Sequence, residues 1–318
     1  MTPRRGRRAL LTAAGALGLG GLGGCATPPQ TRALDQHWPP GLPPRVRLDD
    51  TPFIAQQDYE CGPAALAMLL QRAGRPVTPE QLKPQVYLPG RQGSLQLEML
   101  VAARRHGLAS HRLPPRLDAL LAELAAGHPV LVFQNLSLPL APVWHYAVAI
   151  GYERDTRTLW LHSGREAGMA LPLEVFERTW SRADHWAMLA LPPEQLPATL
   201  DADALASGLV ALERLDAAAA QRGYAQALRR WPRHAVLLMG LGNSAYAQRR
   251  LDQAQDAYVR LTLAHPQLAD GWNNLAQVAL ERGRRGEARA AIARAVALGG
   301  PREPAYRALQ RRIQAGGS

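Results

Sequence analysis

At 318 residues and 47 % hydrophobic composition, the chain can bury the cores of about two globular domains, which excludes a mainly disordered protein. The formal net charge is +11, but acidic residues are interspersed among the basic ones along the chain. Because this pattern forms no single basic run, we expect a solvated basic surface and no nucleic-acid partner.

Residues 1–25 have the order of an export signal. Arginines come first, and an apolar run over residues 9–22 follows, which is short for a membrane-spanning helix. The end of the segment, Leu22–Cys25, resembles the lipobox of bacterial lipoproteins, which implies that Cys25 becomes the lipidated first residue. Ala26 implies, by the same resemblance, an outer-membrane location facing the periplasm. The alternative is a secreted protein in which Cys25 is incidental.

Residues 26–52 are rich in proline. Proline fixes its own φ angle and has no backbone N–H, so closely spaced prolines are typical of extended linkers. We therefore expect an extended, non-helical tether that holds the folded body away from the lipid surface.

A predicted helix begins at Cys61. Pro63 fits its first turn, and Gly74 follows its last apolar residues. The other cysteine, Cys25, lies in the leader, so a disulfide between the two is not plausible. The positive end of the helix would lower the pKa of the Cys61 thiol, as a nucleophile requires. A buried structural cysteine is the alternative.

The rest of residues 53–193 predicts helices first and strands afterwards. Thr78 and Gln81 form a capping box, and Ser94 is a candidate cap for the next helix, which ends near Gly107. The order favours an α+β domain and is also the order of a papain-like fold. The remaining predicted elements are a helix over residues 117–124 and strands over residues 130–133, 144–152, 158–162 and 186–191.

Two short stretches carry a family resemblance. Gln56 stands five residues before Cys61, and a later predicted strand carries His145 near its start; this order is similar to that of bacteriocin-processing cysteine peptidases of the double-glycine type. The resemblance implies that Cys61 is the nucleophile, that His145 is the general base and acid, and that Gln56 donates to the oxyanion. The chemistry needs a thiolate, an imidazole and a donor of these kinds. Gln57 is an alternative to Gln56.

The third member of the site departs from the family pattern. Family members usually have an aspartate after the strand that follows the histidine, whereas this chain has His162 at the end of that strand. A neutral His162 could accept the Nδ1–H of His145, but it lacks the charge that stabilises an imidazolium. Slower turnover or a changed pH optimum is expected. Asp155 is a further candidate, although it is typical of a turn residue, and a structural or substrate-facing role for His162 stays open.

No metal or other cofactor is expected. The sequence has no HExxH motif, no cysteine pair at ligand spacing, and no glycine-rich phosphate loop outside the leader.

Residues 200–318 contain a sequence repeat with a period of about 34 residues. Ala220, Ala254 and Ala288 align at this period, as do Pro232 and Pro266. The pattern resembles tetratricopeptide repeats, with a generic helical bundle as the alternative, and it implies a protein partner. The expected units are residues 201–234, 235–268 and 269–302, with residues 304–314 as a cap.

Together these patterns predict a membrane-anchored cysteine peptidase that acts on a peptide or protein and uses its repeats to bind substrate or a partner. Two further functions stay open. One is a catalytically silent, peptide-binding lipoprotein scaffold, and the second is an acyl or amide transferase that uses the same Cys61 and His145 pair.

Overall fold

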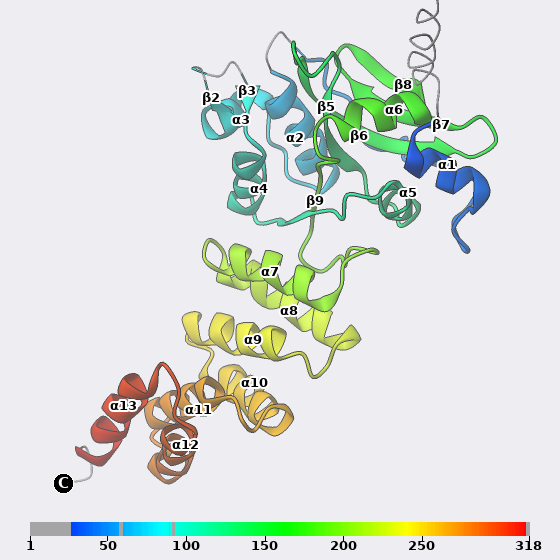
Figure 1. The fold of residues 1–318 in the computed structure, drawn as a ribbon. Helices are drawn as coiled ribbons and strands as arrows, with labels where there is room; N and C mark the ends of the chain where they lie inside the picture. Colours follow the sequence, from blue (N-terminus) through cyan, green and yellow to red (C-terminus); the bar gives the residue numbers. More distant parts are fainter. Residues whose placement is uncertain (1–26, 57–59, 89, 91–92, 316–318) are drawn as a thin grey trace, which may run out of the picture.

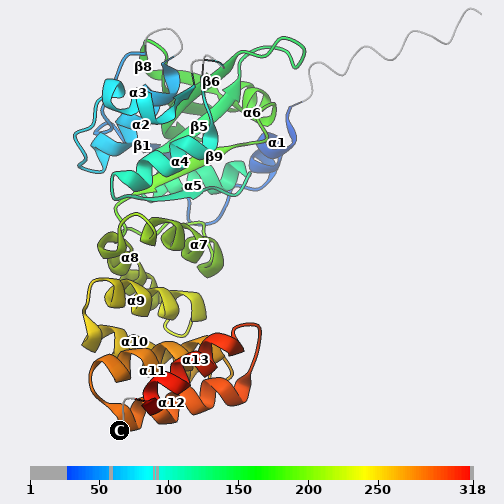
Figure 2. The ribbon, with the colours of Figure 1, turned by 90° about the vertical axis from the view of Figure 1, so that its left-hand side faces the viewer.

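The computed structural model describes residues 27–56, 60–88, 90 and 93–315. A sheet-containing domain comes first, and pairs of helices stack beneath it in the view of Figure 2, with the last helix at the far end. This arrangement confirms the predicted fold class. Cys25 lies outside the described residues.

The sheet of the first domain is antiparallel throughout. Its strands lie in the order β4-β9-β5-β6-β7-β8, and β1 pairs with the far end of β6 (Figure 1). A separate small ribbon joins β2 to β3. The strands are β1 (Arg45–Arg47), β2 (Tyr87–Leu88), β3 (Gly93–Ser94), β4 (Ala109–Arg112), β5 (Val130–Asn135), β6 (Trp144–Glu153), β7 (Thr158–Ser163), β8 (Glu166–Pro172) and β9 (Ala187–Leu191).

Both faces of the sheet are covered by helices, so its central strands are apolar at successive positions rather than at alternate ones. Leu131 and Val148 pack into the core beneath α2, whereas Val132 and Ala147 pack into the opposite core beneath α5 and α6. The helices of this domain are α1 (Pro29–Gln36), α2 (Cys61–Arg72), α3 (Pro79–Val86), α4 (Gln96–Arg105), α5 (Leu117–Ala125) and α6 (Leu173–Ser181).

Most of the predicted helix ends are confirmed. Thr78 and Gln81 form the predicted capping box at the start of α3, and Gly74 follows α2 with a φ of +75°. The prediction for Ser94 was wrong. Ser94 lies in β3 opposite Tyr87, and α4 begins after Leu95 with no side-chain cap. Strand pairing therefore uses the residue that the local pattern assigned to a cap.

The predicted extended tether was also wrong where the structure describes it. Residues 29–36 form helix α1, and the carboxylate of Glu177 on α6 accepts hydrogen bonds from its first turn. The distances are 2.9 Å from the Gln30 N–H and 2.6 Å from both the N–H and the hydroxyl of Thr31. Prolines are tolerated in a first turn, and an anion there matches the helix dipole. The segment is thus part of the domain.

The second region has the predicted repeat organisation. Close helix approach requires small residues, since a Cβ on Gly242 would lie 2.4 Å from the Tyr258 ring and one on Gly240 would lie 2.2 Å from the Tyr224 ring. The predicted units each contain one helix pair, and the predicted cap is a seventh helix. These helices are α7 (Ala202–Glu213), α8 (Ala217–Arg230), α9 (Ala235–Ala247), α10 (Leu251–Ala264), α11 (Ala269–Glu281), α12 (Arg285–Leu298) and α13 (Glu303–Ala315).

The two regions are joined by buried polar contacts. Glu123, which is fully buried on α5, accepts hydrogen bonds from the His128 ring, from the Ala198 N–H, and from both the N–H and the hydroxyl of Thr199. His111 on β4 packs against Gly208 on α7, where a Cβ would lie 2.3 Å from the imidazole. The linker and the first repeat helix are therefore fixed to the first domain.

Within the described ranges, no helix combines the length and the hydropathy that crossing a membrane requires.

Candidate active site

Cys61 is the first residue of α2, and the chain around this helix start is closely packed at the next residue. Gly62 follows it, and a Cβ there would lie 2.3 Å from the Ser94 hydroxyl oxygen. Only glycine lets β3 approach the helix start this closely. The Tyr146 hydroxyl donates to the Ser94 carbonyl at 3.0 Å and so ties the same ribbon to β6. The start of α2, β3 and β6 are consequently held close together, and Cys61 at this junction is partly buried.

Two of the predicted site residues, Gln56 and Cys61, lie against the backbone of Tyr146, and the third, His145, precedes Tyr146 in the chain. The backbone N–H of Tyr146 acts on the Cys61 thiol and opposes the rise in its pKa, and the Tyr146 carbonyl accepts from Gln56 Nε2 at 3.4 Å. His145 is the preceding residue on β6. Gln56 is itself fixed, because its N–H donates to the Gly164 carbonyl at 2.9 Å. The structure thus brings the thiol and the amide side chain to the strand that carries the imidazole.

His145 has a partner that the sequence did not single out. Its Nε2 lies 2.8 Å from the Ser163 hydroxyl oxygen at the end of β7. With Nε2–H as donor to Ser163, Nδ1 keeps a free lone pair and can act as a base. A hydroxyl orients the ring but contributes no negative charge.

Burial dominates the electrostatics of the site. Desolvation raises the pKa of the Cys61 thiol, although hydrogen bonds from the Tyr146, Gly62 and Cys61 N–H groups oppose it. Burial also lowers the pKa of His145. The N–H groups at the helix start lower the thiol pKa as predicted, but the predicted net lowering was wrong, because desolvation outweighs them. Both shifts favour the neutral thiol and the neutral imidazole over the thiolate and the imidazolium.

His162 does not occupy the position predicted for it. Its Nε2 donates to the Thr51 carbonyl at 3.1 Å, and its Nδ1 accepts from the Gly168 N–H at 3.0 Å. Its ring also packs against Phe53, with centroids 5.3 Å apart. With both nitrogens engaged, His162 has no donor or acceptor left for His145. Consecutive strand residues face opposite sides, which explains why Ser163 reaches His145 instead.

Asp155, the further candidate for the third position, takes no part in this site. It is exposed in the β6–β7 turn, which follows the C-terminal end of β6, whereas His145 lies near the N-terminal end of that strand. About ten residues of strand at about 3.3 Å each separate the two side chains. Gln57, the candidate in place of Gln56, lies outside the described residues.

Ser163 and Tyr146 are the site residues that sequence reasoning missed. A local signal existed only for Ser163, which sits next to the position where the aspartate was expected. Tyr146 acts mainly through its backbone, and backbone hydrogen bonding has no residue-type signature. Among the residues that the structure describes, no group of three or more His, Cys, Asp or Glu side chains could hold a metal ion.

Comparisons with known proteins agree with this organisation. Residues 50–186 match the Peptidase C39 family, and residues 205–254 and 239–303 match the tetratricopeptide repeat family. The chain therefore carries a peptidase domain of the C39 family followed by tetratricopeptide repeats. No curated protein gives a significant match.

Two solved structures resemble separate parts of the chain. A crystal structure of a C39-like peptidase from Bacillus anthracis is 20 % identical, covers 46 % of this chain and 97 % of its own, and has a TM-score of 0.39. The Sgt2 TPR domain from Aspergillus fumigatus is 19 % identical, covers 36 % of this chain and 80 % of its own, and has a TM-score of 0.33.

Proposed function

We propose that the protein is a cysteine peptidase of the bacterial cell envelope, anchored through a lipid on Cys25, which hydrolyses peptide bonds with Cys61 and His145. The observation that carries this proposal is the meeting of the Cys61 thiol, the Gln56 amide and the His145 strand around Tyr146. The C39 family match over residues 50–186 supports the same reaction class.

In the proposed reaction, Nδ1 of His145 takes the thiol proton as the Cys61 sulfur attacks the scissile carbonyl carbon. Gln56 Nε2 then turns from the Tyr146 carbonyl to donate to the oxyanion. The tetrahedral intermediate collapses to an acyl-thioester, and the imidazolium returns its proton to the leaving amine. Water, deprotonated by His145, hydrolyses the thioester and regenerates the thiol.

The test compares the wild-type chain with Cys61→Ala and His145→Ala. A peptide library is incubated with each protein, and cleavage is followed by mass spectrometry together with covalent labelling by a thiol-directed inhibitor. We expect Cys61→Ala to abolish labelling at this position and to lower the cleavage rate at least about 10⁴-fold. Equal cleavage by wild type and Cys61→Ala would rule out the proposal.

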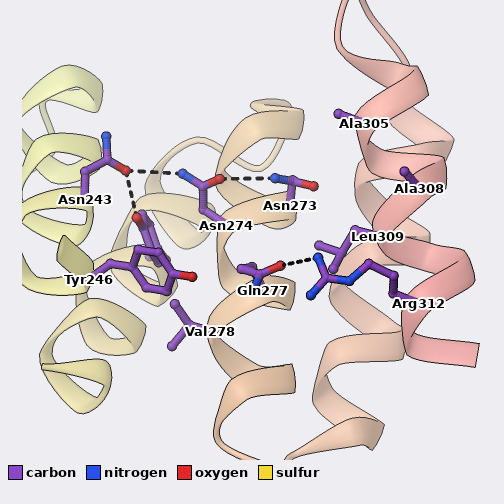
Figure 3. A pocket seen from close by; sticks show the side chains of 11 residues that line it. Asn243, Tyr246, Asn273, Asn274, Gln277, Val278, Ala305, Ala308, Leu309 and Arg312 are labelled. Carbon is purple, nitrogen blue, oxygen red and sulfur yellow. Dashed lines mark hydrogen bonds between the residues drawn. The ribbon is translucent and has the colours of Figure 1, made fainter. Parts of the chain in front are cut away.

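The repeats offer a groove with polar and apolar lining residues for a peptide or protein partner. A cavity of about 440 Å³ lies between α9, α11 and α13. Figure 3 shows Asn243 and Asn274 joined by a 3.3 Å hydrogen bond on one side, and Gln277 and Arg312 joined at 3.5 Å on the other. Amides and a guanidinium can bind the backbone and carboxylates of an extended peptide.

Phage-displayed peptides would test this groove. We expect Asn274→Ala with Arg312→Ala to abolish enrichment of the peptides that wild type selects. The matched control is Arg311→Ala, on the same helix but outside the groove lining. Equal enrichment by the groove variant and wild type would exclude the groove as the binding surface.

The envelope location rests on the lipobox-like segment that ends at Cys25. Intact-mass analysis of the N-terminal peptide is expected to find diacylglycerol on Cys25 in wild type and none in Cys25→Ala. Fractionation of a Gram-negative host is expected to place the wild-type protein in the outer membrane. An unmodified Cys25 would contradict the anchor without affecting the peptidase proposal.

A catalytically silent, peptide-binding scaffold is the second candidate. It is favoured by the raised pKa of Cys61, by the lowered pKa of His145, and by a neutral hydroxyl at Ser163. If the protein is a scaffold, Cys61→Ala should keep the cellular phenotype and deletion of residues 201–318 should abolish that phenotype. The reverse result would reject the scaffold function.

A further inference from the structure

The connection between β5 and β6 exposes an unusual concentration of apolar side chains. We call residues 136–143 the apolar loop. Leu138 is 66 % exposed and Leu140 is 99 % exposed, with Leu136 and Val143 about half exposed. Trp144 follows at 50 % exposure, and no charged residue occurs from the start of the loop to this tryptophan. A contiguous apolar surface of this kind marks a contact with a partner or a membrane.

The exposure does not result from an unstructured base. The Asn135 side-chain oxygen accepts hydrogen bonds from the Ser137 and Val143 N–H groups, both at 3.0 Å. The Leu136 N–H donates to the Val143 carbonyl at 2.8 Å, and Trp144 stacks on Phe133 with centroids 5.1 Å apart. The fold therefore holds the leucines outward on a closed hairpin end. Figures 1 and 2 show this end projecting from the side of the domain that faces away from the repeats.

Helix α6 connects the loop to the start of the described chain. Gln134, just before the loop, donates to the Thr179 hydroxyl at 2.6 Å, and Arg182 donates to the Asn135 carbonyl at 3.4 Å. Glu177, less than one turn before Thr179, holds the first turn of α1. The base of the loop and the beginning of α1 are thus fixed within about two turns of the same helix.

The chain length before α1 limits the distance to the proposed anchor. Pro29 follows Cys25 by four residues. Four extended residues span at most about 14 Å. A lipid on Cys25 would hold α1, and with it the α6 face beside the apolar loop, close to the bilayer surface.

We propose that the apolar loop inserts into the interfacial region of the phospholipid bilayer that carries the protein. This inference rests on the lipid anchor of the proposed function. Leucine side chains gain free energy on leaving water, and tryptophan prefers the boundary between headgroups and acyl chains. The loop and the lipid act as two membrane contacts, which fix the orientation of the domain as well as its location. Trp144 adjoins His145, so the candidate active site opens beside the membrane surface.

Fluorescence quenching in vesicles tests the insertion. The full chain is reconstituted into vesicles of phosphatidylethanolamine and phosphatidylglycerol with brominated acyl chains, and the Trp144 signal is the difference between wild type and Trp144→Phe. We expect the ratio of inserted to free loop to fall about tenfold for each of Leu138→Asp and Leu140→Asp. The matched control is Leu263→Asp, a leucine of α10 that is 76 % exposed, which should leave Trp144 quenching unchanged.

Equal quenching of Trp144 in wild type and in the variant that combines Leu138→Asp with Leu140→Asp overturns the proposal, whether or not Cys25 proves to be lipidated. A raised KM for a soluble peptide together with unchanged quenching also overturns it and assigns the loop to substrate binding. Lower quenching with an unchanged KM supports membrane insertion. The anchor itself is read from the mass of the N-terminal peptide, and peptidase activity does not enter the fluorescence signal, so failure of either is recognised separately.

Discussion

The stabilising polar contacts in the two regions of the molecule join residues at different separations along the sequence. In the repeats, polar side chains join residues about one repeat apart, as Gln221 does with Gln253 and Gln255 does with Glu287, both 32 residues away. In the peptidase domain, the buried carboxylates of Glu123 and Glu177 bind segments about 75 and 147 residues distant. Stability should therefore be close to additive along the repeats and cooperative across the peptidase domain.

Removing a buried carboxylate should have the largest effect. Glu123→Ala leaves the Ala198 and Thr199 N–H groups and the His128 ring without their acceptor, and we expect a loss of about 4 kcal/mol in unfolding free energy. Urea denaturation measures it. The control is Glu194→Ala, in the linker that also contains Ala198 and Thr199. The exposed ion pair of Glu194 with Arg222 should contribute less than about 1 kcal/mol. Similar losses for the two variants would refute the special role of Glu123.

His111 should make the junction between the regions sensitive to acid. Burial, assisted by the positive charge of Arg104 and opposed by Glu123, lowers its pKa to about 4 from an ordinary value of 6.5. Between these values the unfolded chain binds the proton and the folded chain does not, so stability falls as the pH falls through 6.5 and the loss is complete below about 4.

This acid-dependent loss should reach about 3 kcal/mol, and His111→Leu should remove it. The unfolding free energy of each protein is measured near pH 7 and near pH 4. The change between the two pH values in the variant is then subtracted from the change in wild type, which cancels the contribution of other titrating groups. The same pH dependence in both proteins would show that His111 is protonated without cost in the folded chain.

A packing change inside the repeats should have a smaller and more local effect. A Cβ in Gly242→Ala would meet the Tyr258 ring, at an expected cost of about 2 kcal/mol. The control, Gly286→Ala in the first turn of α12, meets nothing within 4 Å and should be neutral or slightly stabilising. Calorimetry should find only the transition of the repeats lowered, with Cys61 alkylation unchanged. A matching drop in the peptidase transition would mean that the two regions unfold as one unit.

The same contrast explains what the sequence could predict. Each helix pair packs mainly against the neighbouring pairs and needs the same residue types at the same positions, so a period of about 34 residues located the three repeat units. Cys61 could be placed at a helix start from Pro63 and Gly74 alone. Helix α1 could not be predicted, because the carboxylate that holds its first turn belongs to Glu177, far away in the sequence.

The third site residue could not be predicted for a similar reason. The choice between His162 and Ser163 depends on which side of β7 faces His145. The ladder between β7 and β8 shifts between Leu161 and Ser163, and an irregularity of this kind is set by neighbouring strands rather than by the local pattern. Sequence reasoning located the strand end and offered His162 as a candidate, with a structural role as the alternative, but it did not consider the adjacent Ser163.

The smallest predicted effect tests that choice directly. Ser163→Asp puts a carboxylate where a hydroxyl now lies 2.8 Å from His145 Nε2. An adjacent anion favours the charged imidazole, so it should raise the pKa of His145, and the resulting imidazolium should in turn lower the pKa of the Cys61 thiol. A shift of one unit would increase the thiolate fraction near neutral pH about tenfold.

Alkylation of Cys61 by iodoacetamide, followed by mass spectrometry across pH, measures this shift. In wild type the raised thiol pKa predicts a rate that still increases above the ordinary midpoint of a thiol. The midpoint should move down in Ser163→Asp and stay nearly unchanged in Ser163→Ala. His162→Ala serves as the control, because the ring nitrogens of His162 bind Thr51 and Gly168. A midpoint that responds to His162→Ala and not to Ser163→Asp would return the third position to His162.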